Sequence, residues 1–278
     1  MGLDLDKSRP LSQTPSEVGE DRRIATLARS LESSQDQPCR LHFDVPQHAH
    51  AQGSGLVNIR ARMLDSTSIQ KARRHLRAAD PVMKTVIDAV GPFTLRLERD
   101  RFGMLVRSII SQQISTSAAR SIRRRLQEFV GPDGMKPSNL ARFTAEQLRS
   151  VGLSPQKASY VADLAHKVND GTVDLRQIGR LSDDRIVEHL TQVKGIGRWT
   201  AQMFLIFSLG RLDVFPHDDL GVRTAIRNRY GLDDLPDKQT AHAIAAPWRP
   251  YASVASWYCW RTLDLARKTE TVAKGYPT

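Results

Sequence analysis

A glycine turn between two predicted helices has residue types and spacing that could bind a ligand. Gly195-Ile196-Gly197 separates a helix that ends near Val193 from a strongly apolar helix that starts at Arg198. Glycine lets the backbone adopt positive φ, and the first amides of the new helix, from Gly197 to Thr200, have no partner within the helix. These amides and the helix dipole predict a phosphate site, with charge added by Lys194 and Arg198. The alternative is an ordinary corner between two helices.

Two adjacent carboxylates follow the apolar helix. Asp218 and Asp219 come directly after Pro216 and His217 and stand at the start of a predicted helix over residues 219–230. Pro216 stiffens the approach to this helix. A carboxylate at a helix N-terminus is stabilised by the helix dipole and stays ionised. Taken alone, either residue is also explained as a helix cap.

Helices are predicted for nearly all of the chain around these residues. Apolar residues recur at helical spacing, and capping signals at Thr144–Gln147, Ser154-Pro155 and Ser182 mark helix starts. Only residues 94–97 are a weak strand candidate. We therefore predict an all-α fold of about ten helices with short connections. The longer predicted helices are 81–90, 101–114, 115–130, 155–168, 183–193, 198–209, 219–230, 238–246 and 251–267.

Composition divides the 278 residues into three parts. Residues 1–65 are polar and are predicted to be a disordered tail, residues 66–270 form the helical domain, and residues 271–278 are a C-terminal tail. Met63 stands just before the composition changes, so residues 1–62 are hypothesised to come from a mis-assigned upstream start.

Charge and cysteine content narrow the class of protein. The formal net charge is +11, and residues 1–66 hold 8 Lys and Arg against 9 Asp and Glu, so the basic excess lies in the helical domain. Such a domain suits a polyanion, most often nucleic acid; the alternative is a protein that is merely basic. No apolar run is long enough to span a bilayer, and no secretory signal is evident. Two cysteines exclude a disulfide framework and a four-cysteine zinc or iron–sulfur site within the chain.

Five motifs stand in an order that resembles the helix–hairpin–helix (HhH-GPD) DNA glycosylase superfamily, and in particular the bacterial 3-methyladenine DNA glycosylase II group. The resemblance covers residues 67–268. It implies a bilobed helical fold with the active site between two helical subdomains and the helix–hairpin–helix at about residues 183–209. The motifs are Ile109–Ser115, Gly152–Ala158, Val193–Ala201, Val214–Leu220 and Trp248–Tyr258.

The resemblance implies a hydrolase of base excision repair that acts on a nucleotide flipped out of damaged duplex DNA. It makes Asp219 the catalytic carboxylate, which stabilises an oxocarbenium-like sugar and helps to position or deprotonate a water molecule. Alkylated purines such as 3-methyladenine and 7-methylguanine already carry positive charge, so they leave without an elaborate general acid. The role of Asp218 is left open.

Position 199 separates the two kinds of glycosylase in the resembled superfamily. Members that cleave the strand carry a lysine there, and Trp199 offers no amine for a Schiff base, which implies base excision without lyase activity. Trp199 and Trp257 match aromatic positions that stack on the flipped base, although both are also explained as core residues. Met203 replaces a further pocket aromatic, which implies a differently shaped base pocket.

The resemblance also assigns contacts with DNA. Gln112, Gln113 and Ser115 lie in a turn that faces DNA, with Gln113 at the position of the wedge that fills the gap left by the flipped base; the alternative is that these glutamines cap helix ends. At the hairpin, the DNA-binding residues are Lys194, Gly195, Gly197, Arg198 and Thr200. The carbonyls of Val193 and Ile196 match a K⁺ or Na⁺ site. No cofactor is required and no iron–sulfur cluster is expected.

Damaged double-stranded DNA is thus the expected partner of a cytoplasmic monomer, nucleoid-associated if the source is bacterial, with no membrane contact. Two alternatives are kept. One is a non-catalytic helix–hairpin–helix module that only binds DNA. The other is a glycosylase for deaminated or oxidised bases.

Overall fold

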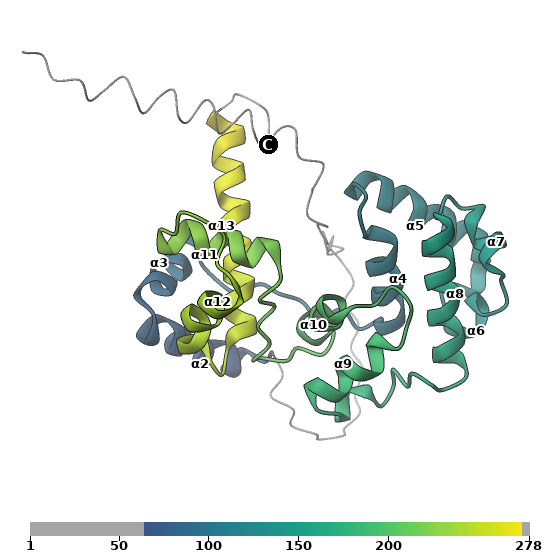
Figure 1. The fold of residues 1–278 in the computed structure, drawn as a ribbon, viewed down its shortest axis with the longest axis horizontal. Coiled ribbons are helices and arrows are strands. Elements are labelled where there is room, and N and C mark those ends of the chain that lie inside the picture. The colour runs from purple at the N-terminus through teal and green to yellow at the C-terminus, as the bar shows by residue number, and fades with distance from the viewer. Residues whose placement is uncertain (1–63, 274–278) are drawn as a thin grey trace, which may run out of the picture. The chain divides into compact units, whose positions relative to one another are not determined.

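The structure, a computed structural model, describes the backbone of residues 64–273 and the side chains as far as residue 266 (Figure 1). Between residues 64 and 273 it contains helices and turns and no strand, as predicted. The predicted tails lie outside the described residues with two exceptions. Leu64 and Asp65 are described, and Asp65 is the N-cap of the first described helix. The last helix, α13 (Ala252–Ala273), continues past its predicted end into residues 271–273. None of the helices in the described part is both long and apolar enough to cross a bilayer.

The helix bounds follow the capping and periodicity signals closely. Thr144 and Gln147 form the predicted reciprocal capping box, and Ser154 and Ser182 accept the backbone N–H groups three residues later. The helices before α13 are α2 (Ser66–Ala79), α3 (Pro81–Val90), α4 (Arg101–Ser111), α5 (Thr116–Val130), α6 (Pro137–Leu140), α7 (Ala145–Arg149), α8 (Pro155–Asn169), α9 (Asp183–Thr191), α10 (Arg198–Phe207), α11 (Leu220–Tyr230) and α12 (Lys238–Ala245).

Two further details of the predicted elements were wrong. Helix α4 ends at Ser111 rather than at residue 114, because Gln113 has φ 55°, which a right-handed helix cannot accommodate. Residues 94–97 form no strand. The Glu98 N–H that follows them bonds to the Phe207 carbonyl at the end of α10, so the neighbour of this segment is a helix and not another strand.

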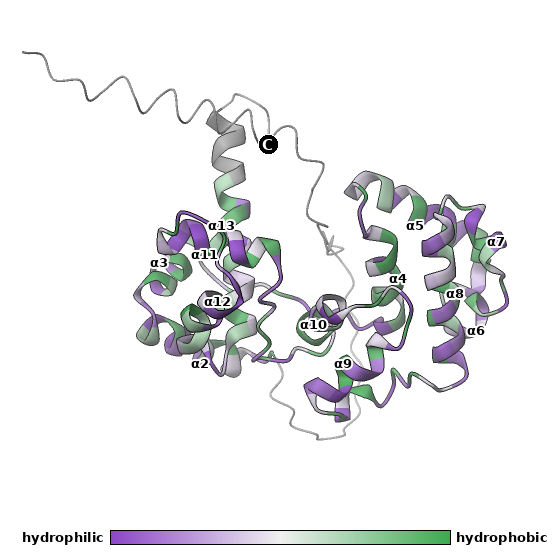
Figure 2. Ribbon diagram, viewed as in Figure 1, coloured by the Kyte–Doolittle hydropathy of each residue, from purple (hydrophilic) through white to green (hydrophobic). Residues whose placement is uncertain are grey.

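The helices bury two hydrophobic clusters. The first takes its residues from α4 to α10, and the second from α2, α3 and α11 to α13. Helices such as α9 carry both hydrophobic and hydrophilic residues, as expected when one face is buried (Figure 2). Trp260 of α13 packs against both clusters. The predicted site residues therefore belong to helices of two separate cores.

Candidate active site

The hairpin between α9 and α10 has the geometry of a phosphate-binding turn. Gly195 has φ +78°, and a Cβ atom there would overlap the Tyr160 ring, so glycine is required on two grounds. Gly197 is the N-cap of α10 and offers no capping side chain, which leaves the first amides of that helix open. Lys194 and Arg198 are exposed beside them, whereas Thr200 is buried. The turn lines an open hollow of about 470 Å³.

Asp219 is held in one orientation by three hydrogen bonds. It is the N-cap of α11, and its Oδ1 atom accepts the Val222 N–H at 2.8 Å. The same oxygen accepts the Trp260 indole N–H at 2.8 Å, and Oδ2 accepts the Trp199 indole N–H at 2.8 Å. The residue is 8% exposed. Its carboxylate is therefore fixed beside the start of α10, next to the hairpin.

Trp260 was missed by the sequence analysis, which selected Trp257 from the same helix. Trp260 stacks on Phe207 with ring centroids 5.4 Å apart and reaches Asp219. A Cβ atom on Gly221 would lie 2.9 Å from Trp260 Cδ1, so this indole also depends on a glycine at the start of α11. No local signal distinguished the two, because residues three apart lie on the same side of a helix and both are tryptophans.

The other two predicted pocket residues lie within the clusters. Trp257 is 6% exposed and packs on Phe93, with ring centroids 4.5 Å apart, in the second cluster. Met203 is 2% exposed in the first cluster. Of the aromatic residues predicted for the base pocket, Trp199 is the one that the structure brings to Asp219.

Asp218 differs from Asp219 in its surroundings. Its side chain is 69% exposed and lies 3.2 Å from His217 Nε2. Burial lowers the pKa of His217, with the Asp218 carboxylate opposing that shift. At the turn into helix α11, the Asp218 carboxylate therefore points into solvent, whereas the Asp219 carboxylate lies against two indoles.

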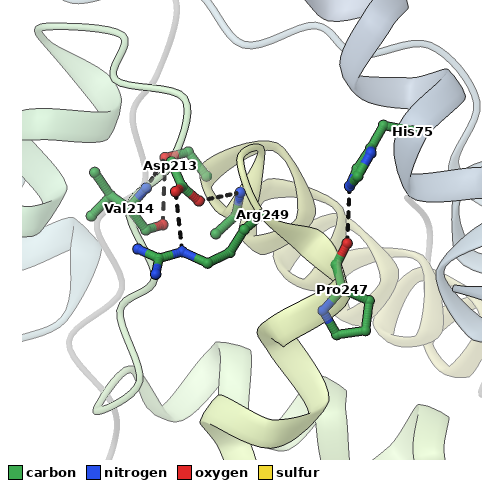
Figure 3. A network of polar contacts seen from close by, with 7 residues as sticks. His75, Asp213, Val214, Pro247 and Arg249 are labelled. Atoms are coloured by element: carbon green, nitrogen blue, oxygen red, sulfur yellow. Dashed lines mark hydrogen bonds and ion pairs between the residues drawn. The ribbon is translucent and has the colours of Figure 1, made fainter. Parts of the chain in front are cut away.

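The loop that precedes Asp219 is hydrogen-bonded through Asp213 and Val214 to the start of α13 and the residues just before it (Figure 3). Asp213 accepts hydrogen bonds from Arg249 Nε at 3.1 Å and from the Ala252 N–H at 3.3 Å. The Val214 N–H donates to Ser253 Oγ at 2.9 Å. Because α13 also carries Trp260, these bonds fix the loop and one of the donors to Asp219 on the same element.

The turn between α4 and α5 lies against the hairpin. Gln112 Nε2 donates to the Gly195 carbonyl at 2.8 Å, so this amide joins the two segments. Ser115 caps α5 by accepting the Ala118 N–H at 3.3 Å. Gln113 is exposed and is the only non-glycine residue with positive φ in the described part of the chain. Gln113 and Ser115 are thus the exposed predicted residues of this turn, whereas Gln112 is half-buried against the hairpin.

The hairpin carbonyls fit a hard monovalent cation by donor type. Val193 and Ile196 have buried side chains, and the Val193 carbonyl accepts the Ile196 N–H at 3.1 Å while retaining a second lone pair. In the described region no group of three or more His, Cys, Asp or Glu side chains converges to hold a metal ion.

Comparison with known proteins places this architecture in a family. Residues 106–250 match the model of the HhH-GPD superfamily of base excision DNA repair proteins. This span holds the α4–α5 turn, the hairpin and Asp219. The chain belongs to this superfamily, whose members bind and repair DNA.

Individual relatives are similar over most of their length. DNA-3-methyladenine glycosylase 1 of Schizosaccharomyces pombe is 34% identical over 212 residues, which are 74% of this chain and 92% of the relative. The structure of a 3-methyladenine DNA glycosylase from that yeast in complex with abasic DNA is 33% identical, with a TM-score of 0.64, and covers 70% of this chain and 98% of its own. A DNA-3-methyladenine glycosidase of Bacillus halodurans is 33% identical with a TM-score of 0.64, over 74% and 92% of the two chains.

Proposed function

We propose that this protein is a monofunctional DNA glycosylase that removes alkylated purines, of the 3-methyladenine and 7-methylguanine class, from damaged double-stranded DNA in base excision repair. The observation that carries the proposal is the Asp219 carboxylate, held by two indoles beside an open helix–hairpin–helix turn. Relatives named 3-methyladenine glycosylases share this architecture over most of their chains and support the substrate class.

Asp219 would act on the sugar of an extruded nucleotide. As the C1′–N bond breaks, its electron pair leaves with the base and positive charge develops on the sugar, where a fixed carboxylate stabilises it. Water then adds to C1′ and gives up a proton, for which the Asp219 carboxylate would be the acceptor. An alkylated purine is already cationic, so its departure needs no acid, and the electron-rich face of Trp199 suits such a base.

The same arrangement opposes strand cleavage by the protein. A lyase step needs an amine that forms an imine with C1′. Position 199 holds an indole whose N–H is bound to Asp219 Oδ2. We therefore expect an intact abasic strand as the product.

The hairpin would hold the DNA backbone. The amides at the start of α10, with exposed Lys194 and Arg198, suit a phosphate group, and a K⁺ or Na⁺ ion on the carbonyls of Val193 and Ile196 would strengthen that site.

Asp219→Asn tests the proposal. An amide cannot supply the negative charge that the sugar needs, so release of 7-methylguanine from alkylated duplex DNA should fall at least about a hundredfold, while DNA binding changes little. Asp218→Asn is the matched control and should retain activity within about threefold, because its exposed carboxylate is screened by solvent. Near-normal release by Asp219→Asn would eliminate the assignment.

The wild-type protein distinguishes the two alternative functions. Binding of damaged DNA without release of any base would indicate a DNA-binding module. Release of only hypoxanthine or oxidised bases would indicate a glycosylase for deaminated or oxidised bases.

A further inference from the structure

One face of helix α8 supports both segments that are proposed to contact DNA. Lys157, Tyr160, Asp163 and Lys167 recur at spacings of three and four residues, which places them along a single side of the helix. Three of the four residues are charged, and Tyr160 packs against the first hydrophobic cluster, which other residues of α8 also line. The proposed chemistry uses none of these four residues.

The C-terminal half of this face holds the hairpin. Asp163 Oδ2 accepts the backbone N–H of Lys194 at 2.8 Å and the Lys167 Nζ group at 3.0 Å. Lys167 Nζ also donates to the Gln192 carbonyl. The Tyr160 ring lies against Gly195, where no Cβ atom would fit. The hairpin backbone is thus fixed to α8 at Gln192 and Lys194, before its glycine, and the glycine itself packs on the Tyr160 ring.

The N-terminal end of the same face holds the α4–α5 turn. Lys157 Nζ donates to the Ile110 carbonyl at 2.8 Å and to the Gln112 carbonyl. These two carbonyls flank the end of α4, directly before Gln113. The Gln112 side chain then crosses to the Gly195 carbonyl of the hairpin. The turn is consequently tied both to α8 and to the hairpin.

These ties explain how Gln113 keeps a backbone conformation that side chains rarely adopt. A residue other than glycine at φ 55° is strained, and such strain persists only where surrounding bonds over-determine it. Here the Lys157 ammonium group binds the Gln112 carbonyl, directly before Gln113. The Gln112 side-chain amide is in turn bound to the Gly195 carbonyl of the hairpin. The backbone at Gln113 is therefore held at a set position relative to the phosphate-binding turn, and its side chain is exposed.

We propose that Lys157 and Gln112 are positioning residues that join the Gln113 turn and the hairpin into one rigid DNA-contacting unit. When the hairpin binds a phosphate, Gln113 then stands where it fills the space left by an extruded base. The inference rests on the proposed glycosylase function. It assigns Lys157 to base extrusion and not to the chemical step.

The test compares a paired lesion with one that is already unpaired. Lys157→Met keeps the length of the side chain and removes its N–H donors. Extrusion from a stacked pair costs free energy that an unpaired base does not require. With 7-methylguanine opposite cytosine, the single-turnover release rate should fall about tenfold, the effect of losing hydrogen bonds from a charged group. With the same lesion in a one-base bulge, the rate should fall less than about threefold.

Two variants serve as controls for this comparison. Lys157→Arg retains charged donors and should restore release from the paired lesion to within about threefold of wild type. Lys167→Met removes a lysine–carbonyl hydrogen bond from the same helix face, but this bond is made to the hairpin. This variant should weaken DNA binding and change the release rates from the paired and the bulged lesion by the same factor. Equal loss on both substrates in Lys157→Met would indicate a general structural defect and overturn the proposal, as would no loss on either.

Fluorescence of 2-aminopurine placed beside the lesion separates this inference from the proposed chemistry. Wild-type protein should raise the fluorescence as the neighbouring base is extruded, and Lys157→Met should reduce that rise. This readout does not require bond cleavage. If wild-type protein raises fluorescence but releases no base, the glycosylase function fails while the positioning role is retained; an equal rise in both proteins rejects the positioning role.

Discussion

Two buried aspartates of this protein, Asp80 and Asp219, have the same local hydrogen-bonding pattern in different surroundings. Asp80 is the N-cap of α3, and its Oδ1 atom accepts the N–H groups of Val82 and Met83 at 2.9 and 3.0 Å. Its Oδ2 atom accepts the Trp248 indole N–H at 2.8 Å and the Tyr230 hydroxyl. Asp219 likewise caps a helix and accepts indole N–H groups. The hydrogen-bonding pattern alone therefore does not identify the functional carboxylate.

The difference lies in where the donors come from. Trp248 is completely buried, and it and Tyr230 belong to the second cluster, so Asp80 joins elements of a single core. The indoles around Asp219 are half-buried; Trp199 packs on the first cluster, and Trp260 contacts both. Asp219 thus lies where two cores meet beside the hairpin, and its partners keep a partly accessible face. Variants at the two positions should consequently separate stability from activity.

The largest effect on stability is expected at Asp80. In Asp80→Asn the new NH₂ group faces the Trp248 N–H, so a buried donor is left unpaired and the Tm should fall by roughly 5–10 °C. Excision per folded molecule should be unchanged. Thermal denaturation and single-turnover release at a temperature where both proteins are folded provide the measurement. A loss of release at unchanged Tm would contradict the structural role of Asp80.

The next largest effects, on release rate at Asp219 and on Tm at Asp80, are expected when one indole N–H donor is removed at each aspartate. Trp260→Phe keeps a ring against Phe207 but removes the bond to Asp219 Oδ1, so release of 7-methylguanine should fall about tenfold with a small change in Tm. The matched variant Trp248→Phe should lower the Tm and leave the release rate of the folded protein intact. Opposite behaviour of the pair would remove the distinction between the two aspartates.

The smallest effect concerns the pH dependence of stability and is expected at Tyr230, a partner of Asp80. Burial, together with the Asp80 carboxylate, raises the pKa of Tyr230. The unfolded chain ionises this phenol near pH 10 while the folded protein keeps it neutral, so its contribution to stability is complete below about pH 10 and declines as the pH rises further. Denaturant titrations at pH 9 and 11 should show a smaller alkaline loss for Tyr230→Phe than for wild type. Trp199→Phe should show the wild-type loss, because indole does not titrate; equal losses in all three proteins would refute the effect.

The local elements were largely predictable because their signals are short in sequence. Ser154 before Pro155, the Thr144–Gln147 pair and the glycines at 195 and 197 set helix starts and the hairpin turn through bonds that span a few residues. The end of α4 was not predictable in this way. The turn at Gln113 depends on Lys157, which is 44 positions further along the chain.

The sequence by itself determined the all-helical fold, the hairpin and the presence of Asp219 at a helix start, because periodicity, glycine and capping residues act locally. Only the tertiary structure decided which tryptophan of α13 reaches Asp219, since Trp257 and Trp260 have the same chemistry and differ only in the direction of their rings. It also decided how the surroundings of the two buried aspartates differ. Asp80 and Asp219 have the same capping geometry, and what distinguishes them is the meeting of two cores that are remote in sequence.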